Sequence, residues 1–234
     1  MILLLTGTLA EESIVFSEDF ESGSQNWNLA GSWHLERIDN NTVLQGIGHV
    51  WARLTNGGWD NYVLRAKFKI VHGTIHFNYR HNEVDGSLHR YFIGISSTDL
   101  YLRKQIEVEF YFLAGIFLSP QLGDGWHEIE IRGYGNILNI YLDNTLLLVY
   151  KDDNNPILNG TIAFETLEES EVWIDDVEIR ETNLEDVSNR LEKTNRLEKT
   201  NRLELIPYAI LVIVIAIVTF FFINLSIKQR KQEK

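Results

Sequence analysis

The sequence contains no cysteine among its 234 residues, and only three prolines and one methionine. The absence of cysteine excludes disulfide bonds, thiolate metal sites and a cysteine nucleophile. Positive charge is also scarce, because 21 lysines and arginines stand against 33 acidic residues, for a formal net charge of −12. Proteins that bind nucleic acid need a basic surface, so nucleic acid is excluded as a partner class.

The composition is that of a folded β domain with additional segments. Hydrophobic residues make up 44% of the chain, which also contains 16 glycines, as expected of a globular domain and not of a disordered chain. A chain of this length has room for one sizeable domain and short flanking segments. Alternating polar and apolar residues dominate up to residue 181, and no convincing helical pattern occurs before residue 182.

The stretch Trp126–Tyr150, WHEIEIRGYGNILNIYLDNTLLLVY, carries the clearest strand pattern. Ile129 and Ile131 alternate with charged residues, and Leu138 and Ile140 alternate with polar residues after a Gly-Asn pair. An Asp-Asn pair then precedes a third apolar run. Period-2 apolar spacing interrupted by such turn pairs predicts a half-buried antiparallel meander of three strands.

Similar patterns recur along the chain and predict β-structure throughout this region. About a dozen strands with few prolines indicate an all-β fold, a two-sheet antiparallel β-sandwich, over residues 11–182. Besides the meander, strands are predicted at Trp33–Arg37, Thr42–Gln45, His49–Leu54, Tyr62–Val71, Thr74–Arg80, Arg90–Ser96, Leu100–Lys104, Ile106–Leu113, Thr161–Glu165 and Glu171–Arg180.

A long run without charge lies near the end of the sequence, from Ile206 to Ile223. As a helix this run is roughly 30 Å long, enough to cross the hydrocarbon core of a bilayer. Its central part, AILVIVIAIVTFFFI, is apolar on every side, which favours a membrane span over a buried helix of a soluble domain. We therefore predict a transmembrane helix at 205–227, followed by a basic tail at 228–234.

Residues 1–10 resemble the remnant of a signal peptide. A short apolar run, without a preceding basic residue, leads to small residues at Thr8 and Ala10 that suit cleavage before Glu11. Basic residues flank the predicted membrane span on both sides in nearly equal number, so they do not fix its orientation. The signal segment decides the orientation: we expect the sandwich to be extracellular, at the cell surface, and the tail to be cytoplasmic.

Residues 183–204 contain a hexapeptide repeat that connects the sandwich to the membrane span. Its leucines, Leu191, Leu197 and Leu203, recur every six residues, which on a helix scatters them around the axis. A coiled coil needs a period near 3.5 residues, so the repeat favours a solvated stalk over self-association. Oligomerisation through this segment is the alternative.

Three stretches of the sequence resemble a known family. The opening Phe20-Glu21, the meander and the closing Ile174-Asp175-Asp176-Val177 together resemble the laminin-G/concanavalin-A-like jelly rolls, particularly the family 16-like group of glycan-active and carbohydrate-binding domains. The resemblance covers residues 15–181. It implies that the opening strand lies beside the closing strand and that the domain binds or cleaves glycans.

The glycan-cleaving members of this group carry Glu-x-Asp-x-(x)-Glu on one strand, which places the nucleophile and the acid about 5–5.5 Å apart. None of the acidic runs here matches that pattern, so we predict no catalytic residue. His72 and His76 are not a metal pair either, because four residues along a strand span about 13 Å. The acidic runs considered are Glu107–Glu109, Glu128–Glu130 and Asp175–Glu178.

The resemblance also implies a structural calcium ion (Ca2+) where the opening and closing strands meet. Glu21, Asp175 and Asp176 are its candidate ligands, because calcium prefers hard oxygen donors. Strand alternation groups Asp175 with Trp173 and Val177 on the inward face, where a carboxylate is costly unless it is paired or bound to a metal. The alternative is that Asp175 only accepts hydrogen bonds from loop amides.

Outward residues of the middle strands are candidates for ligand binding. In the resembling jelly rolls, aromatic rings of one sheet face stack on sugar rings while polar groups bond sugar hydroxyls. The alternative is an ordinary polar sheet face. Trp51 and Trp59 flank a glycine-rich loop and are candidate surface platforms. The predicted ligand-binding residues are His76, Asn78, Arg80, Arg90, Tyr141 and Glu165.

These observations predict a single-pass, membrane-anchored extracellular sandwich that binds a glycan or a surface partner without catalysis. The expected partners are a polysaccharide or glycoconjugate, the membrane, and a protein at the cell surface. One alternative is a glycoside hydrolase-like enzyme of the same fold. The other is a structural subunit of a membrane protein complex, in which the sandwich packs on another protein and binds no sugar.

Overall fold

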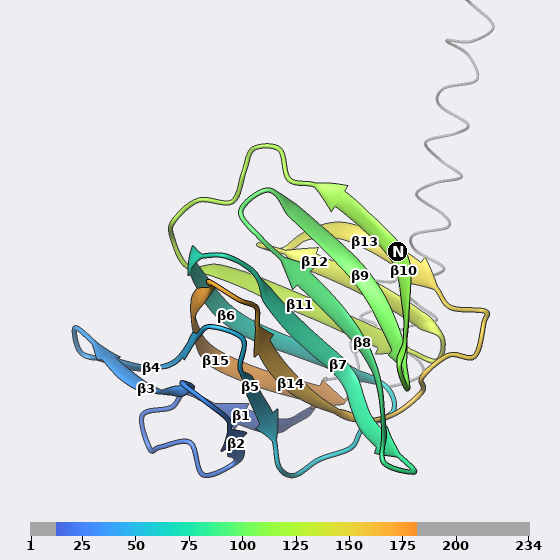
Figure 1. Ribbon diagram of the computed structural model, residues 1–234, viewed down its shortest axis with the longest axis horizontal. Helices are drawn as coiled ribbons and strands as arrows, with labels where there is room; N and C mark the ends of the chain where they lie inside the picture. The colour runs from blue at the N-terminus through green and yellow to red at the C-terminus, as the bar shows by residue number, and fades with distance from the viewer. Residues whose placement is uncertain (1–12, 182–234) are drawn as a thin grey trace, which may run out of the picture. The chain divides into compact units, whose positions relative to one another are not determined.

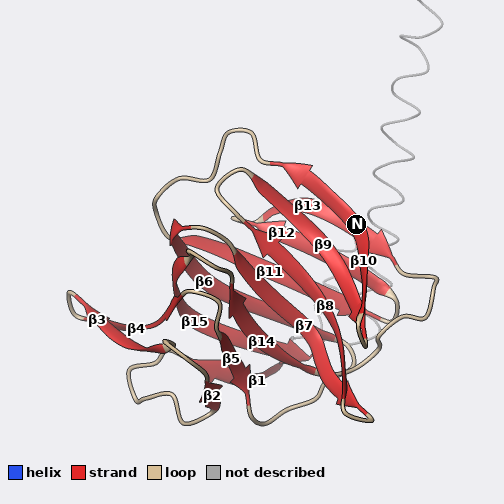
Figure 2. Cartoon of the chain, in the orientation of Figure 1, coloured by secondary structure: helices blue, strands red, loops and turns tan. Residues whose placement is uncertain are grey.

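The computed structural model describes residues 13–181 of the chain. The predicted signal segment, stalk, transmembrane helix and basic tail lie outside these residues, at 1–10, 183–204, 205–227 and 228–234. Within residues 13–181 every regular element is a β-strand (Figures 1 and 2). No helix in that part of the chain is long and apolar enough to cross a membrane.

The strands form two antiparallel sheets, which confirms the predicted all-β sandwich for the described residues. One sheet has eight strands in the order β13-β12-β11-β6-β15-β4-β3, with β1 paired to β15. Its strands are β1 (Ser13–Glu18), β3 (His34–Ile38), β4 (Asn41–Ile47), β6 (Tyr62–His72), β11 (His127–Tyr134), β12 (Ile137–Leu142), β13 (Thr145–Lys151) and β15 (Glu171–Glu181).

The other sheet has seven strands in the order β10-β9-β8-β7-β14-β5-β2 (Figure 1). Neighbours β7, β8, β9 and β10 follow one another along the chain, whereas β14 and β5 come from distant parts of the sequence. Its strands are β2 (Trp27–Leu29), β5 (Trp51–Leu54), β7 (Ile75–Val84), β8 (Ser87–Ile95), β9 (Asp99–Ile106), β10 (Glu109–Phe117) and β14 (Thr161–Thr166).

The predicted meander is confirmed as β11, β12 and β13. Ile131 of β11 lies opposite Ile140 of β12, and both side chains are fully buried. Asp143 and Asn144 form the turn between β12 and β13 with φ angles of 48° and 63°. Two-residue hairpin turns need this left-handed conformation, and Asp and Asn tolerate it better than other side chains.

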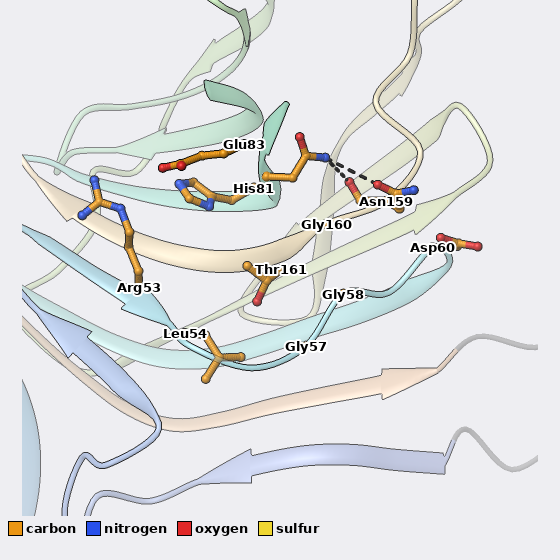
Figure 3. A pocket seen from close by; sticks show the side chains of 11 residues that line it. Arg53, Leu54, Gly57, Gly58, Asp60, His81, Glu83, Asn159, Gly160 and Thr161 are labelled. Atoms are coloured by element: carbon orange, nitrogen blue, oxygen red, sulfur yellow. Dashed lines mark hydrogen bonds between the residues drawn. The ribbon is translucent and has the colours of Figure 1, made fainter. Parts of the chain in front are cut away.

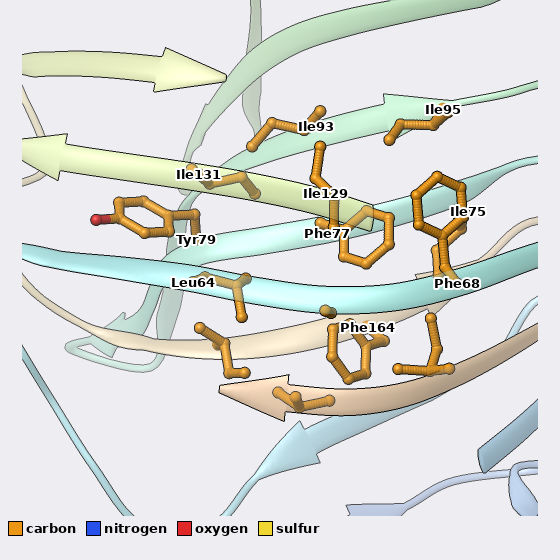
Figure 4. Close-up of a cluster of buried hydrophobic side chains, with 14 of the residues drawn as sticks. Leu64, Phe68, Ile75, Phe77, Tyr79, Ile93, Ile95, Ile129, Ile131 and Phe164 are labelled. Carbon is orange, nitrogen blue, oxygen red and sulfur yellow. The ribbon is translucent and has the colours of Figure 1, made fainter. Parts of the chain in front are cut away.

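The core lies between the two sheets and is built from their inward-facing residues. Figure 4 shows aromatic and aliphatic side chains of both sheets meeting there, among them Phe68, Phe77, Phe164 and Ile129. The ring of Phe77 packs edge-to-face on Phe68 and on Phe164, with centroid distances of 5.3 and 5.7 Å. Because side chains alternate along a strand, the same β7 that sends Phe77 inward sends its neighbour His76 to the opposite face.

The closing strand β15 departs from the predicted alternation at Asp175. Its pairing with β6 shifts register between Asp175 and Glu178, and Asp176 has a φ of 46°. Such a bulge inserts one residue and reverses the faces on which the following side chains lie. Val177 therefore enters the core, whereas Trp173 and Asp175 lie on the outer side, and the predicted inward orientation of Asp175 is wrong.

Strand neighbours and strand ends agree with the sequence in most places. The opening strand β1 pairs with the closing strand β15, as the family resemblance implies, but β1 ends at Glu18, so Phe20 and Glu21, on which the resemblance placed this strand, follow it in a turn. The run Ile106–Leu113, however, is not one strand, because β9 ends at Ile106 and β10 begins at Glu109. Glu107, between them, has a φ of 55°. The run contains no Gly, Pro, Asn or Asp, only Glu107 and Glu109 among apolar residues, so it gave no turn signal and the prediction missed this hairpin.

Candidate functional site

The outer face of the seven-stranded sheet, turned away from the other sheet, gathers polar and aromatic side chains from six strands. The strand register aligns them in three rows that cross the strands, named here the outer-face rows. The first row contains Trp51, Glu165, His76, Gly94 and Tyr101; the second contains Arg53, Ala163, Asn78, Phe92, Arg103 and Phe112; the third contains Arg90, Gln105 and Phe110.

Gly94 makes room for the ring of Tyr101 on this face. A Cβ atom at Gly94 would lie 2.1 Å from Cζ of Tyr101, so the tyrosine ring occupies the space that a side chain would fill. From there the Tyr101 hydroxyl lies 2.7 Å from Nε2 of His76. Glycine is required here by this close approach of the ring.

Glu165 lies at the centre of a buried polar network. Its Oε2 atom accepts hydrogen bonds from Nδ1 of His76 at 2.8 Å and from Nη1 of Arg90 at 2.7 Å. Its Oε1 atom lies 3.1 Å from Nε2 of His49. Burial raises the pKa of Glu165, but the hydrogen bonds and charges of His76 and Arg90 outweigh burial and lower that pKa to about 2. The carboxylate is therefore ionised at neutral pH.

Arg90 connects the rest of the network. Besides Glu165, its guanidinium donates to Oδ1 of Asn78, which is fully buried, and to Oε1 of Gln105 at 2.8 Å. Gln105 in turn donates from Nε2 to the backbone carbonyl of Glu107 at 2.8 Å. A buried polar network whose members have their partners fixes side-chain positions, so this network gives the face a rigid base.

Aromatic rings separate the arginines of this face. The guanidinium of Arg53 lies 4.4 Å from the ring centroid of Trp51, and that of Arg90 lies 4.6 Å from the same centroid. Arg90 also lies 4.5 Å from the ring of Phe92. These distances are within the range of cation–π attraction. One end of the face is thus an alternating series of cations and rings.

The other end of the face repeats this arrangement on β9 and β10. The guanidinium of Arg103 lies 5.2 Å from the ring of Tyr101 and 5.9 Å from the ring of Phe112. Phe110 and Phe112 are 55% and 64% exposed, which is unusual for phenylalanine in a folded domain. These cations and rings form one series that crosses the three outer-face rows; its members are Arg53, Trp51, Arg90, Phe92, Tyr101, Arg103 and Phe112.

A pocket of about 430 Å³ opens beside Arg53 (Figure 3), within the size range of small-molecule sites. Figure 3 shows Arg53, His81 and Glu83 on one side of the pocket and Asn159 on the other. Nε2 of His81 is buried and has no hydrogen-bond partner. Burial and the charges of Arg53 and a second arginine lower the pKa of His81 to about 4. His81 is therefore neutral at pH 7. The loop glycine Gly57 also lines this pocket.

The structure brings together four of the six predicted ligand-binding residues. His76, Asn78, Arg90 and Glu165 lie side by side in the outer-face rows and bond to one another. All four are more than nine-tenths buried. They hold the face in place from beneath, and the groups that a ligand can reach directly are the rings and arginines above them.

Arg80 does not lie on this face. A bulge between Tyr79 and Asn82 and a φ of 51° at Arg80 turn its side chain away from the position that strand alternation predicts. The side chain is fully buried and donates to the backbone carbonyls of Asp60 and Ile157 at 2.7 and 2.8 Å. Arg80 ties together loops that surround the pocket, which is a structural role.

Tyr141 lies on the other sheet. It belongs to β12, opposite Glu130 of β11, and its ring centroid is 5.6 Å from the guanidinium of Arg132. Strand alternation predicted correctly that Tyr141 faces outward. Alternation does not say which sheet a strand joins, so the sequence placed Tyr141 with His76 although the two lie on different sheets.

The three candidate calcium ligands each have a protein partner. Oδ2 of Asp175 accepts from Asn41 at 2.7 Å, Glu21 accepts from the backbone N–H of Thr42 at 2.6 Å, and Asp176 pairs with a lysine. Burial raises the pKa of Asp175 despite its hydrogen bonds. Among residues 13–181 no group of three or more His, Asp or Glu residues is arranged to hold a metal ion. Calcium stays a prediction of the resemblance.

Sequence reasoning missed several residues of the face. Tyr101, Arg103 and Gln105 alternate along β9 with buried leucines, so strand parity alone could have found them. Lys104 of the same strand was also missed; it points between the sheets, where Nζ pairs with Asp152 at 2.7 Å. No sequence signal marks that pair, because its partners are far apart in the chain.

Comparisons with known proteins identify the fold. No protein-family model and no curated protein sequence matches the chain. The carbohydrate-binding module CBM66 from Bacillus subtilis matches with a TM-score of 0.54 and 10% identity, covering 66% of this chain and 95% of the module. A glycoside hydrolase family 16 endo-glucanase from Bacteroides ovatus matches with a TM-score of 0.57 and 12% identity, covering 71% of this chain and all of the enzyme chain.

A third solved structure agrees with these two. The laminarinase catalytic domain from Thermotoga maritima matches with a TM-score of 0.57 and 9% identity, covering 74% of this chain and 99% of that domain. Identities this low establish the fold and not the activity. The described part of the chain has the jelly-roll β-sandwich fold that carbohydrate-binding modules and family 16 glycoside hydrolases share.

Proposed function

We propose that this sandwich binds a polysaccharide or glycoconjugate on the outer face of its seven-stranded sheet and does not cleave it. The observation that carries the proposal is a group of exposed or partly exposed rings on this face, Trp51, Tyr101, Phe110 and Phe112. They lie above a rigid, hydrogen-bonded base centred on Glu165. Sugar sites combine flat apolar surfaces with a few fixed polar groups. The fold of the similar carbohydrate-binding module supports the same class of ligand.

The exposed phenylalanines support binding in particular. Phe110 and Phe112 leave more than half of their surface in solvent, on the same face as Trp51 and Tyr101. Exposed apolar patches on a monomeric domain commonly mark binding sites. Stacking of sugar rings on these side chains would remove apolar surface from water, at about 25 cal/mol for each Å².

The protonation state of Glu165 supports binding rather than cleavage. A glycosidase needs a general acid with a raised pKa and a second carboxyl group at a defined distance. The pKa of Glu165 is instead lowered to about 2, and its oxygens already accept from His76 and Arg90. Hydrolysis remains the second candidate, because His49 lies within hydrogen-bond distance of both Glu165 and Glu168, which brings two carboxylates near one another.

Attachment to the cell membrane is also part of the proposal, and it rests on the sequence. The apolar run within 205–227 is long enough to span a bilayer, and the stalk at 183–204 would hold the sandwich above the surface. Protease protection of the tail at 228–234 in intact cells, with cleavage of the sandwich by external protease, would support the orientation. Digestion of the tail in intact cells would refute it.

A glycan array probed with the full-length chain in mild detergent tests the binding proposal. We expect selective binding that weakens at least tenfold in a Phe110→Ser/Phe112→Ser double variant. The matched control is Val149→Ser on β13 of the other sheet, where Val149 is 62% exposed; its binding should be unchanged. An array without signal from folded protein, or equal binding by the double variant, would refute the proposal.

The parent protein and a Glu165→Gln variant test the alternative of hydrolysis. Release of reducing ends from a bound polysaccharide, lost in Glu165→Gln while binding persists, would establish an enzyme. Bound polysaccharide that stays intact during prolonged incubation would support the non-catalytic role. A partner protein that co-purifies in equal amount, together with a blank array, would favour the structural-subunit alternative.

A further inference from the structure

We propose that the ligand of this face is an acidic polysaccharide, whose carboxylate or sulfate groups are bound by Arg53 and Arg103. This inference rests on the proposed function and specifies its ligand class. Three observations lead to it: the charge of the face, the absence of ion-pair partners for these two arginines, and their spacing along one row.

The outer-face rows carry a positive net charge on an acidic protein. Within the outer-face rows the charged residues are Arg53, Arg90 and Arg103 against a single acid, Glu165. The whole chain, by contrast, has a formal net charge of −12. Repulsion from the remaining surface disfavours anions elsewhere on the molecule, so the face stands out as the place where an anionic ligand can bind.

Arg53 and Arg103 form no ion pair within the described residues. Most other arginines of the sandwich have partners: Arg90 pairs with Glu165, and Arg65 pairs with Glu130. In a domain with excess acid, two arginines without a carboxylate on one face are available to a ligand. Each guanidinium has five N–H donors in a planar fork that fits carboxylate and sulfate oxygens in pairs.

Aromatic rings hold both guanidinium groups in defined positions. The guanidinium of Arg53 lies over the ring of Trp51, and that of Arg103 lies 5.2 and 5.9 Å from the ring centroids of Tyr101 and Phe112. Stacking uses the flat side of the guanidinium and leaves its edge donors free for an anion. The rings also restrict the side chains before binding, which reduces the entropy lost when a ligand orders them.

The spacing of the two arginines requires an extended ligand. Arg53 and Arg103 lie in the same outer-face row, on β5 and β9, with β14, β7 and β8 between them. Four strand spacings at about 4.8 Å place them roughly 19 Å apart across the sheet. A single small anion cannot reach both, whereas a polymer with repeated anionic groups can lie across the strands and bind both ends of the row.

The pocket beside Arg53 sets the direction in which the anionic group lies. Asp60 and Glu83 line this pocket together with Arg53, and Figure 3 places Glu83 near His81 on the same side as Arg53. These carboxylates would repel an anion deep in the pocket. We therefore place the anionic group of the ligand over Arg53, on the side of Arg53 that faces Trp51 and away from the pocket. A neutral part of the sugar chain then lies at the pocket.

The test compares matched polysaccharides on the full-length chain in mild detergent. Polygalacturonate and alginate supply carboxylates, dextran sulfate supplies sulfates, laminarin and dextran are neutral, and polyglutamate is a polyanion without sugar. We expect at least tenfold tighter binding of one acidic polysaccharide than of the neutral ones, and weakening by added salt. The better of the carboxylate and sulfate polymers identifies the anionic group.

Variants assign the effect to residues. Arg53→Gln and Arg103→Gln should each weaken acidic binding about three- to tenfold and reduce its salt dependence. The matched control is Arg37→Gln, an exposed arginine on β3 of the other sheet, which should bind as the parent does. Thermal unfolding of each variant confirms that it is folded.

The outcomes separate this inference from the proposed function. Tight binding of a neutral glucan that is indifferent to both substitutions would refute the acidic ligand and keep the glycan-binding function. Equal binding of polyglutamate would refute recognition of an acidic sugar, because charge alone would account for it. Failure of every polysaccharide to bind folded protein would refute both.

Discussion

Replacing Glu165 by glutamine tests whether the buried network holds the face together. In the native protein the Glu165 carboxylate accepts from His76 and Arg90 and lies near His49. Glutamine keeps the size and shape of the side chain but removes its charge. Arg90 then stays buried without its ionic partner, although Asn78 still accepts from its guanidinium.

The size of the effect follows from the pKa of Glu165. A decrease from 4.5 to about 2, at 1.36 kcal/mol for each unit, corresponds to about 3 kcal/mol of stability. Loss of one member of a buried ion pair costs about 3–5 kcal/mol. We expect Glu165→Gln to lower the free energy of unfolding by about 3 kcal/mol at pH 7, and the Tm by about 6–12 °C.

The dependence on pH supplies a sharper test. Because the folded pKa of Glu165 lies below its unfolded value, its stabilisation is complete above about pH 4.5 and is lost as pH falls toward 2. Urea unfolding of parent and variant, followed by tryptophan fluorescence, should show a difference that is constant near neutral pH and shrinks through this window. A difference below about 1 kcal/mol at pH 7, or one that does not change with pH, would refute the reasoning.

Three further substitutions probe neighbouring features. His81→Gln should reduce the loss of stability that the parent shows as pH falls from 6.5 to 4. The pKa of His81 is about 4 in the folded protein, below its ordinary value of 6.5, so the unfolded chain takes up this proton at a higher pH. Plots of unfolding free energy against pH that run parallel for parent and variant would contradict this. Gly94→Ala should cost about 1–3 kcal/mol in urea unfolding and displace Tyr101, since the new Cβ lies 2.1 Å from its ring. Lys104→Met should cost about 3 kcal/mol by leaving Asp152 buried without its cation, and an unchanged Tm would refute that expectation.

The fold was predictable because local and long-range preferences agree. In β6 the alternation from Tyr62 to Ile70 puts apolar residues on one side, and these are the residues that the core buries. The Asp143-Asn144 pair predicted a hairpin, and both residues have the positive φ that such a turn needs. Period and turn chemistry are properties of short segments, so one sequence suffices to read them.

The candidate site was predictable only where strands keep their alternation. His76 and Asn78 lie where the pairing of β7 with β8 is regular, and Arg90 lies where the pairing of β8 with β9 is regular. Arg80 and Asp175 were misplaced because bulges follow each regular segment, with positive φ at Arg80 and at Asp176. Bulges at residues other than glycine leave no clear mark in a sequence, and each one reverses the faces of the residues beyond it.

Sheet membership was the other limit. Tyr141 faces outward as predicted, yet it lies on the eight-stranded sheet, and Glu165 reaches the seven-stranded sheet through β14, inserted between β5 and β7. Which strands become neighbours depends on packing across the whole domain. The ion pair of Lys104 with Asp152 between the sheets has the same origin, since its partners meet only after both sheets form.

Burial divides the residues of the face into two groups with different consequences for mutation. Glu165, Arg90 and Asn78 are almost fully buried, so their replacement should reduce stability first and binding only indirectly. Arg53 and Arg103 are not fully buried and have no ion pair, so their replacement should change binding with little effect on the Tm. Stability and ligand selectivity of this sheet can therefore be altered separately, and a variant of Arg103 that unfolds as readily as one of Glu165 would contradict this division.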